Sequence, residues 1–300
     1  MQTAFAPARF AHLIFAPAAF ARMLSVHAVL HSIYKLWLRV ACMADVEKLS
    51  GLFVNAVRQS CNAQTAILFS GGLDSSLIAT VAKRFCEPLL VTAGIENSSD
   101  LEAACAVAAQ LGLPHEKVVL GEAEIIKVYN KWHRLARGGQ LNKIELMVPV
   151  FACCRAAAKA GKWNVLLGSG AEELFVGYER YFDYLKEKKD LKEILEKEFA
   201  ALPAGDCAAT DMVAKSFGMA AKYPFLNAAF SQEVLSLPIK ERVGTRENKK
   251  PLLRKMAQNL GVPALAVERR KIAMQYGSGV HKILLKAKKA GLLEPEASQD

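Results

Sequence analysis

The fold of this chain is decided by one stretch, Ala66-Ile67-Leu68-Phe69-Ser70-Gly71-Gly72-Leu73-Asp74-Ser75-Ser76. An apolar run leads through two glycines into a helical pattern. Glycines let the backbone turn tightly and approach an anion closely, and the N–H groups that open a helix point at that anion. The hydroxyls of Ser70, Ser75 and Ser76 add further donors. The stretch therefore predicts a strand, a phosphate-binding loop and a helix.

The aspartate of the loop indicates a metal ion. Asp74 would be repelled by phosphate unless a cation lies between them, so it is predicted to be a ligand of Mg²⁺. The G-x-x-x-x-G-K-[ST] pattern occurs nowhere in the chain, and the loop is not the G-x-G-x-x-G pattern of dinucleotide sites. The loop thus predicts a different kind of pyrophosphate site.

Short apolar runs alternate with helical patterns from Met43 onward. The predicted strands cover residues 65–69, 89–92, 117–120 and 163–167, and the predicted helices cover residues 45–60, 73–85, 100–111, 122–133 and 149–160. Strands separated by helices of this length imply a parallel sheet with helices on both faces. After Leu167 the pattern is mostly helical, so we expect an α/β core over residues 43–185 and a helical part over residues 186–300.

Residues 1–42 differ from the rest in composition. They contain no Asp or Glu, are rich in Ala and Phe, and are predicted to lie outside the fold. They are either an extension ahead of a start at Met43 or a targeting or membrane-surface helix, whose basic face would consist of His27, His31, Lys35 and Arg39. No stretch long enough to span a membrane is free of charge and His, so a spanning helix is not expected.

The composition favours a globular cytoplasmic protein over a secreted or nucleic-acid-binding one. The seven cysteines include no C-x-x-C unit, which favours free thiols in a reducing compartment, and Cys153-Cys154 is predicted to pack in the core. The net charge is +10, but Lys186–Lys192 mixes Lys with Glu and Asp as a solvated helix does. The surplus equally suits a site for ATP and an acidic substrate, so nucleic acid is not favoured.

Five segments resemble one family in the same order along the chain. S-G-G-x-D-S resembles the PP-loop of ATP pyrophosphatases, which cleave ATP between the α and β phosphates to adenylate an acceptor. Residues 165–178, V-L-L-G-S-G-A-E-E-L-F-V-G-Y, resemble the asparagine synthetase pattern S-G-x-G-x-D-E-x-F-x-G-Y. Residues 222–227, 250–254 and 270–279 resemble R-x-P-F-L-D, K-x-x-L-R and R-x-K-x-x-x-x-x-G-x-G. The resemblance, which includes residues 92–112, implies an adenine nucleotide alpha hydrolase-like fold (HUP type) and an ATP-dependent amidoligase.

The resemblance also implies roles for individual residues. Asp74 and Glu172 would carry Mg²⁺ on the pyrophosphate, and Lys271 would neutralise charge at the reacting α-phosphate and acyl centre. Such chemistry needs cations, because a carboxylate that attacks phosphorus is otherwise repelled. The phosphate oxygens would be held by Ser70, Gly71, Gly72 and Ser75, and the adenine would be bordered by Leu68, Ala93, Leu167 and Gly168.

The chain departs from the family pattern at four positions. The family's Glu between the glycines is Ser169, its following Asp is Glu172, its usual Arg is Lys222, and the Asp that closes P-F-L-D is Asn227. The change from Asp to Glu keeps metal ligation, whereas the change from Glu to Ser removes an acid–base group. A glutamine-hydrolysing synthetase of this family carries a long N-terminal nucleophile domain that begins with Cys after the initiator Met, whereas here Gln2 follows Met1 and only residues 1–69 precede the loop. We therefore expect no glutaminase domain, and either free ammonia, a separate glutaminase subunit or another amide-forming reaction.

Three functions follow from these observations. The first is an asparagine synthase-like reaction, in which aspartate and ATP give β-aspartyl-AMP and pyrophosphate and ammonia then displaces AMP. The second is a tRNA-modifying PP-loop ATPase, favoured by the basic charge and disfavoured by the absence of C-x-x-C pairs. The third is a non-catalytic nucleotide-binding subunit, suggested by Ser169 and Asn227. The order of the motifs favours the first.

Overall fold

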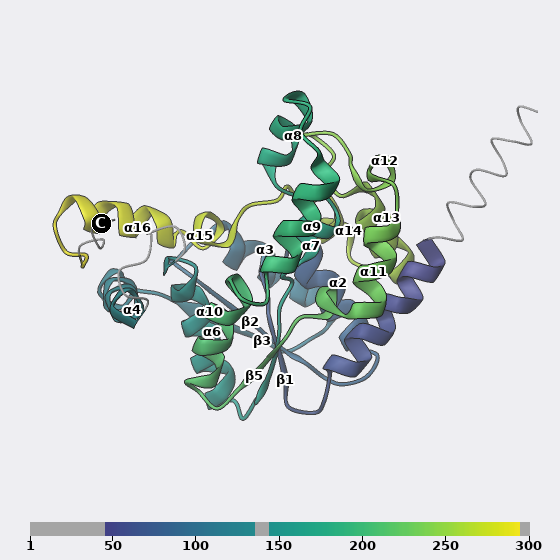
Figure 1. Ribbon diagram of the computed structural model, residues 1–300. Helices are drawn as coiled ribbons and strands as arrows, with labels where there is room; N and C mark the ends of the chain where they lie inside the picture. Colours follow the sequence, from purple (N-terminus) through teal and green to yellow (C-terminus); the bar gives the residue numbers. More distant parts are fainter. Residues whose placement is uncertain (1–45, 136–143, 295–300) are drawn as a thin grey trace, which may run out of the picture. The chain divides into compact units, whose positions relative to one another are not determined.

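A parallel β-sheet forms the centre of the part of the chain that the computed structural model describes, residues 46–135 and 144–294 (Figure 1). Within these residues the sheet has five strands in the order β3-β2-β1-β4-β5. Ile67 of β1 pairs with Leu90 of β2 on one side and with Leu166 of β4 on the other. The strands are β1 (Thr65–Leu68), β2 (Leu89–Gly94), β3 (His115–Val119), β4 (Asn164–Leu166) and β5 (Ala220–Lys222).

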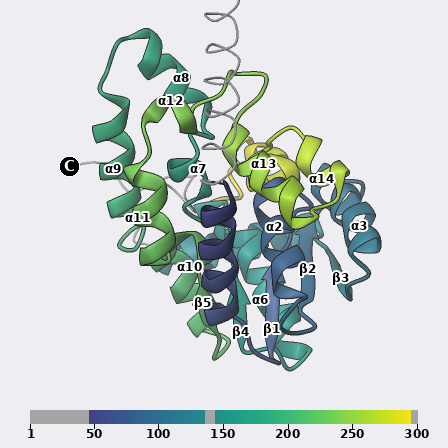
Figure 2. The same cartoon turned by 90° about the vertical axis from the view of Figure 1, so that its right-hand side faces the viewer.

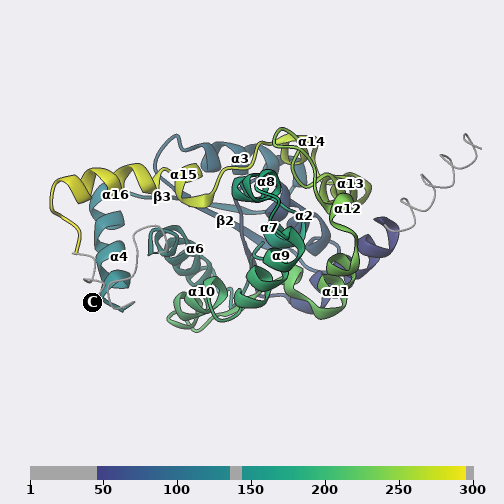
Figure 3. The ribbon, with the colours of Figure 1, turned by 45° about the horizontal axis from the view of Figure 1, so that its top comes forward.

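Helices cover both faces of the sheet, as predicted (Figure 3). One hydrophobic cluster joins the strands to the helix over residues 46–60, α2 (Leu73–Ala82), α3 (Ser99–Leu111), α13 (Pro251–Leu260) and α14 (Ala264–Glu268). A second cluster, on the other face, joins them to α4 (Glu122–Leu135), α6 (Met147–Lys159), α10 (Asp206–Lys215) and α16 (Val280–Lys289). Burial of apolar side chains on both faces, at roughly 25 cal/mol per Å², stabilises this three-layer arrangement.

The remaining short helices follow β4 or connect the later segments. They are α7 (Ala171–Leu174), α8 (Glu179–Lys186), α9 (Leu191–Ala201), the 3-10 helix η1 (Pro224–Leu226), α11 (Ala228–Ser236), α12 (Ile239–Arg242) and α15 (Met274–Gly277). Figure 2 shows α8 and α9 above the sheet, where Tyr181, Leu191 and Leu195 form a small separate core. Among the described residues no helix combines the length and apolarity needed to cross a bilayer.

The four predicted strands and five predicted helices all occur, with ends that differ by a few residues. Strand β5 was not predicted, because it is short and its pattern of exposed, half-buried and exposed residues shows no apolar run. It lies inside the part that we expected to be helical. Cys153 and Cys154 are buried, as predicted. The predicted extension over residues 1–42 lies outside the described residues.

The order of the strands reverses between β1 and β4. The chain goes outward from β1 to β2 and β3, then returns to place β4 and β5 on the opposite side of β1. At such a reversal the loops after the two central strands diverge, and ligands of open α/β sheets bind in the crevice at the carboxyl ends of those strands. The two glycine-rich motifs occupy the loops after β1 and β4.

Candidate functional site

The two glycines of the phosphate loop have different structural roles. Gly71 has a φ of +66°, and a Cβ at this position would lie 2.6 Å from the carbonyl carbon of Ala103 in α3. Only glycine therefore lets the loop pack this closely on α3. Gly72 is the N-cap residue of α2, and no side chain caps the helix there. The first N–H groups of α2 are thus left for a ligand.

The three serines of the loop also divide into two groups. Ser70 and Ser75 bring their Oγ atoms to 3.4 Å, and the amide of Gly72 donates to Ser70 Oγ at 3.4 Å. Both serines line a cavity above the loop. Ser76 is fully buried, and within the described part of the chain its Oγ has no hydrogen-bond partner. The structure therefore brings Ser70 and Ser75, but not Ser76, to the cavity.

The cavity above the loop is strongly basic. Six of its lining side chains are cationic, and only Asp74 is acidic. Such a concentration of positive charge suits a polyanion. The lining residues are Ser70, Gly72, Leu73, Asp74, Ser75, Lys249, Lys250, Arg254, Arg269, Arg270, Lys271 and Ile272.

Two carboxylates and two ammonium groups meet beside this cavity. Lys250 Nζ donates to Asp74 Oδ2 at 2.8 Å and lies 3.0 Å from Glu172 Oε1. Lys271 Nζ lies 2.9 Å from the same oxygen of Glu172 and 4.0 Å from Asp74 Oδ2. The predicted metal ligands and the predicted catalytic lysine are thus brought together from three distant segments.

The charges in this cluster reinforce one another. Burial alone would raise the pKa of Glu172, but Lys250 and Lys271 outweigh it and hold the pKa at about 2. Burial acts to lower the pKa of Lys271, and the charges of Glu172 and Asp74 reverse this and raise it. Both groups are therefore ionised at neutral pH. A Cβ at Gly177 would overlap Glu172 Oε2 and Lys250 Cε, so only glycine fits behind the cluster.

The residues present fit a Mg²⁺ ion that arrives with a phosphate ligand. Asp74 and Glu172 supply hard oxygen donors on either side of one cationic point, Lys250 Nζ. The second oxygen of Glu172, Oε2, is buried without a hydrogen-bond partner among the described residues. Over the same residues no group of three or more His, Cys, Asp or Glu side chains could hold a metal. Two carboxylates suffice for Mg²⁺, which usually takes its other ligands from phosphate and water.

Lys250 is a site residue to which the sequence analysis gave no role. It is buried, and it adopts a left-handed conformation with φ 56° and ψ 47° just before Pro251 opens α13. That conformation costs a non-glycine residue roughly 1–2 kcal/mol. The ion pairs with Asp74 and Glu172 offset this cost. The signal in the sequence was its place at the head of the K-x-x-L-R segment.

The residues predicted to border adenine lie side by side at the ends of three adjacent strands. Ala93 of β2, Leu68 of β1 and Leu167, just after β4, lie in this order across the sheet and share the hydrophobic cluster under α6. They are not among the residues that line the basic cavity. Gly168 adjoins the cluster of charges, since a Cβ there would lie 3.1 Å from Asp74 Cβ. Contact with adenine stays a prediction.

One departure from the family pattern has a structural explanation. Asn227 is the N-cap of α11, where its side-chain oxygen accepts from the amide of Phe230 at 3.3 Å. Asn and Asp are about equally good at this position, so the change keeps the cap. Lys222 is exposed at the end of β5, and its carbonyl accepts from the amide of Leu167 at 3.0 Å. Ser169 lies half-buried in the turn after β4.

A parallel sheet whose central loops carry S-G-G-x-D-S and a facing carboxylate defines a protein of the PP-loop class. The family model for asparagine synthase matches residues 48–201 and 183–299. The chain belongs to the asparagine synthase family.

Relatives with known names agree with this assignment. The chain is 30% identical to a putative glutamine-hydrolysing asparagine synthetase of Methanocaldococcus jannaschii, over 76% of this chain and 48% of that protein. It is 32% identical to the glutamine-hydrolysing asparagine synthetase of Gallus gallus, over 68% and 38%. The chain thus spans less than half the length of these relatives. Among solved structures, the NH3-dependent NAD synthetase from Campylobacter jejuni is 18% identical with a TM-score of 0.39, over 83% of this chain and 84% of that one.

Proposed function

We propose that this chain is an ATP-dependent amidoligase of the asparagine synthase type, a ligase that forms C–N bonds. It adenylates a carboxylate, the side chain of aspartate, and then forms an amide with ammonia. The observation that carries the proposal is the meeting of Asp74 and Glu172 with Lys250 and Lys271 beside the open end of α2. The names of the relatives support the choice of aspartate.

The phosphate loop would hold ATP by its phosphates. The uncapped start of α2 and the hydroxyls of Ser70 and Ser75 supply donors, and the cationic wall of the cavity neutralises the charge of the triphosphate. Mg²⁺, when bound by Asp74 and Glu172, would neutralise charge on the pyrophosphate that leaves. Held in this way, ATP has its α-phosphorus oriented for attack.

Lys271 would act on the approaching acceptor. The aspartate carboxylate and the α-phosphate are both anionic, so their approach needs a cation between them. Lys271 is 42% exposed at the edge of the cavity, and its raised pKa keeps it protonated. As the carboxylate oxygen bonds to phosphorus, the bond to pyrophosphate breaks. Lys271 then offsets the charge on the oxygens at this centre.

The amide forms in a second step. Ammonia, from solution or from a glutaminase subunit, attacks the carbonyl carbon of β-aspartyl-AMP. The new C–N bond replaces the C–O bond to AMP, and ammonia gives up one proton to the released AMP or to water. Asn227 keeps its structural role, so of the two departures that suggested a non-catalytic subunit only Ser169 bears on this chemistry.

The decisive experiment measures AMP and pyrophosphate release by the purified chain with Mg-ATP, aspartate and ammonium. We expect release that depends on aspartate, and asparagine that carries label from ¹⁵N-ammonium. A panel of other carboxylates identifies the acceptor if aspartate is not the one, and release that requires RNA would favour a tRNA-modifying activity. Absence of AMP with every acceptor, together with unchanged ATP binding by Asp74→Ala, would overturn the proposal.

A further inference from the structure

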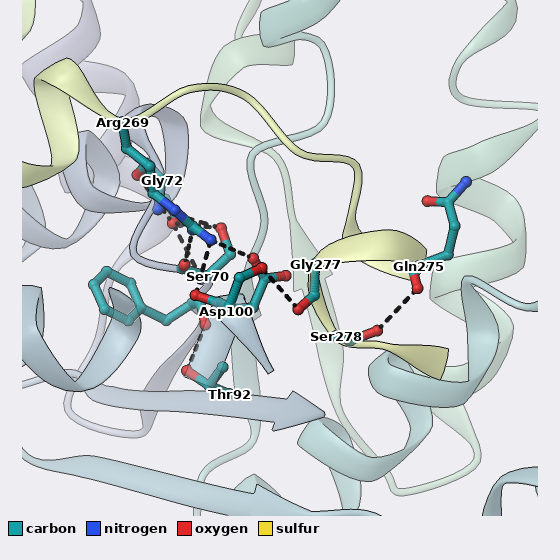
Figure 4. A network of polar contacts seen from close by, with 11 residues as sticks. Ser70, Gly72, Thr92, Asp100, Arg269, Gln275, Gly277 and Ser278 are labelled. Atoms are coloured by element: carbon teal, nitrogen blue, oxygen red, sulfur yellow. Dashed lines mark hydrogen bonds and ion pairs between the residues drawn. The ribbon is translucent and has the colours of Figure 1, made fainter. Parts of the chain in front are cut away.

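Two neighbouring arginines line the basic cavity at the start of the segment that carries Lys271, and they differ in exposure: Arg269 is half-buried and Arg270 is exposed. Arg269 is turned inward, and Figure 4 shows its guanidinium among polar groups of the loops after β1 and β2. Its Nη1 donates to the carbonyl of Ser70, and its Nη2 donates to the carbonyl of Ser99 at 3.0 Å. Arg269 therefore donates to the protein from both Nη1 and Nη2.

The anionic partner of Arg269 is Asp100, in the first turn of α3. Arg269 Nη2 donates to Asp100 Oδ1 at 2.8 Å, and Asp100 is only 3% exposed. Burial raises the pKa of Asp100 despite the opposing charges of Arg269 and Lys271. A Cβ at Gly277 would overlap this carboxylate, so the segment that follows Lys271 packs directly on it. Removal of either partner would leave a buried charge uncompensated.

The segment over residues 269–278 is attached at both ends. At its start, Arg269 holds Ser70 and Asp100. At its end, the carbonyl of Ser278 accepts from the amide of Ile95 at 2.8 Å, just after β2. Lys271 lies between these attachments, in the irregular stretch between α14 and α15. Its position relative to the phosphate loop is thus set through Arg269, two residues away.

We propose that Arg269 and Asp100 form a positioning clamp, which holds the phosphate loop at Ser70 and the segment of Lys271 in a fixed position relative to each other. The clamp rests on the proposed function for its effect on rate. The planar guanidinium reaches three acceptors from two nitrogens, Nη1 and Nη2, whereas an ammonium group would have to reach them all from a single nitrogen. A displacement of about 1 Å in a reacting group can cost about 10²-fold in rate. Arg269 would therefore act on the rate through Lys271 and the loop.

The test compares Arg269 with its neighbour in steady-state kinetics. We expect Arg269→Lys to lower kcat by about 10- to 100-fold while KM for ATP changes by less than about threefold. Arg270→Gln, which removes an exposed cation from the cavity, should instead raise KM for ATP by about tenfold. Arg134→Lys is the matched control, because Arg134 pairs with Glu294 at the same 2.8 Å in an exposed position. It should leave both constants unchanged.

The pairing of Arg269 with Asp100 predicts that their effects do not add. Asp100→Asn should lower kcat by a similar factor, and the double variant should be no slower than the worse single variant. Effects that multiply, or a change in KM alone, would overturn the clamp. Circular dichroism of each variant shows whether it is folded.

A second measurement is independent of activity. Amide hydrogen exchange over residues 70–76 should be faster in Arg269→Lys than in wild type, and as slow in Arg134→Lys as in wild type. Unchanged exchange in Arg269→Lys would overturn the clamp. If wild type releases no AMP while exchange behaves as expected, the proposed reaction fails and the clamp stands as a feature of the loop.

Discussion

Two segments of the chain each bring a lysine to the same oxygen, Glu172 Oε1, but the two lysines differ in burial. At the start of α13, Lys250 is almost completely buried and also holds Asp74 at 2.8 Å. On the irregular segment after α14, Lys271 reaches Glu172 at 2.9 Å but stays 42% exposed. The difference shows that the same charge can hold a site together or face its ligand, depending on burial. Lys250 is of the first kind and Lys271 of the second.

The largest effect should come from removal of the buried lysine. Lys250→Met would leave Asp74 and Glu172 close together with Lys271 as their remaining cation. Loss of one partner from a buried ion pair costs about 3–5 kcal/mol, so the free energy of unfolding in urea should fall by about that much at pH 7. Lys286→Met is the control, because Lys286 pairs with Glu122 at the exposed surface, and it should cost less than about 1 kcal/mol. Equal losses in Lys250→Met and Lys286→Met would mean that the buried Lys250 contributes no more to stability than an exposed lysine does.

Removal of the exposed lysine should change rate rather than stability. Lys271→Ala takes away a cation at the edge of the cavity, and loss of one such stabilising group lowers kcat by about 10²- to 10³-fold. Its free energy of unfolding should stay within about 1 kcal/mol of wild type, since the side chain is far from fully buried. AMP release and urea unfolding measured on the same preparation check both parts. A loss of stability as large as that of Lys250→Met would contradict the assignment of roles.

The sequence predicted the features of this site that are local. The phosphate loop and the strands before and after it are continuous stretches, so their apolar and glycine patterns are visible in the sequence. Arg269 and Lys250 act through contacts with Asp100 and Asp74, which lie 169 and 176 residues away along the chain, and no local pattern indicates such contacts. Ser76 was predicted as a donor to phosphate because its hydroxyl belongs to the phosphate loop. One helical step turns its side chain from the cavity into the core.

Glu172 and Glu173, two adjacent residues of α7, should change the stability of the fold with pH in opposite directions. The pKa of Glu172 is lowered to about 2, so its ion pairs stabilise the fold above about pH 4.5, and that stability is lost as the pH falls toward 2. Burial, with a smaller contribution from the charge of Glu172, raises the pKa of Glu173 to about 7. The folded state then holds a proton that the unfolded state has lost, so stability falls as the pH rises from about 4.5 through 7.

Substitution of Glu172 and of Glu173 by glutamine should therefore change the free energy of unfolding in opposite directions. Glu173→Gln should stabilise the protein by about 3 kcal/mol at pH 8 and by almost nothing at pH 4. Glu172→Gln should destabilise it at pH 7, where two lysines lose their partner. Urea unfolding of both variants across pH 4–8 gives the answer. A Glu173→Gln curve parallel to that of wild type would mean that the pKa of Glu173 is the same in the folded and unfolded states.

The smallest effect concerns Asn227, which we assign to the group of residues that hold the structure together. Its side chain caps α11 through the amide of Phe230, at 3.3 Å. Asn227→Asp, which restores the family residue, keeps an oxygen at the cap, so it should leave kcat unchanged and the free energy of unfolding within about 0.5 kcal/mol of wild type. Asn227→Ala removes the cap and should cost about 1 kcal/mol in unfolding with no change in kcat. A rise in kcat of tenfold or more in Asn227→Asp would instead place this residue with Lys271 among those that act on the reaction, and would make the departure at this position functional.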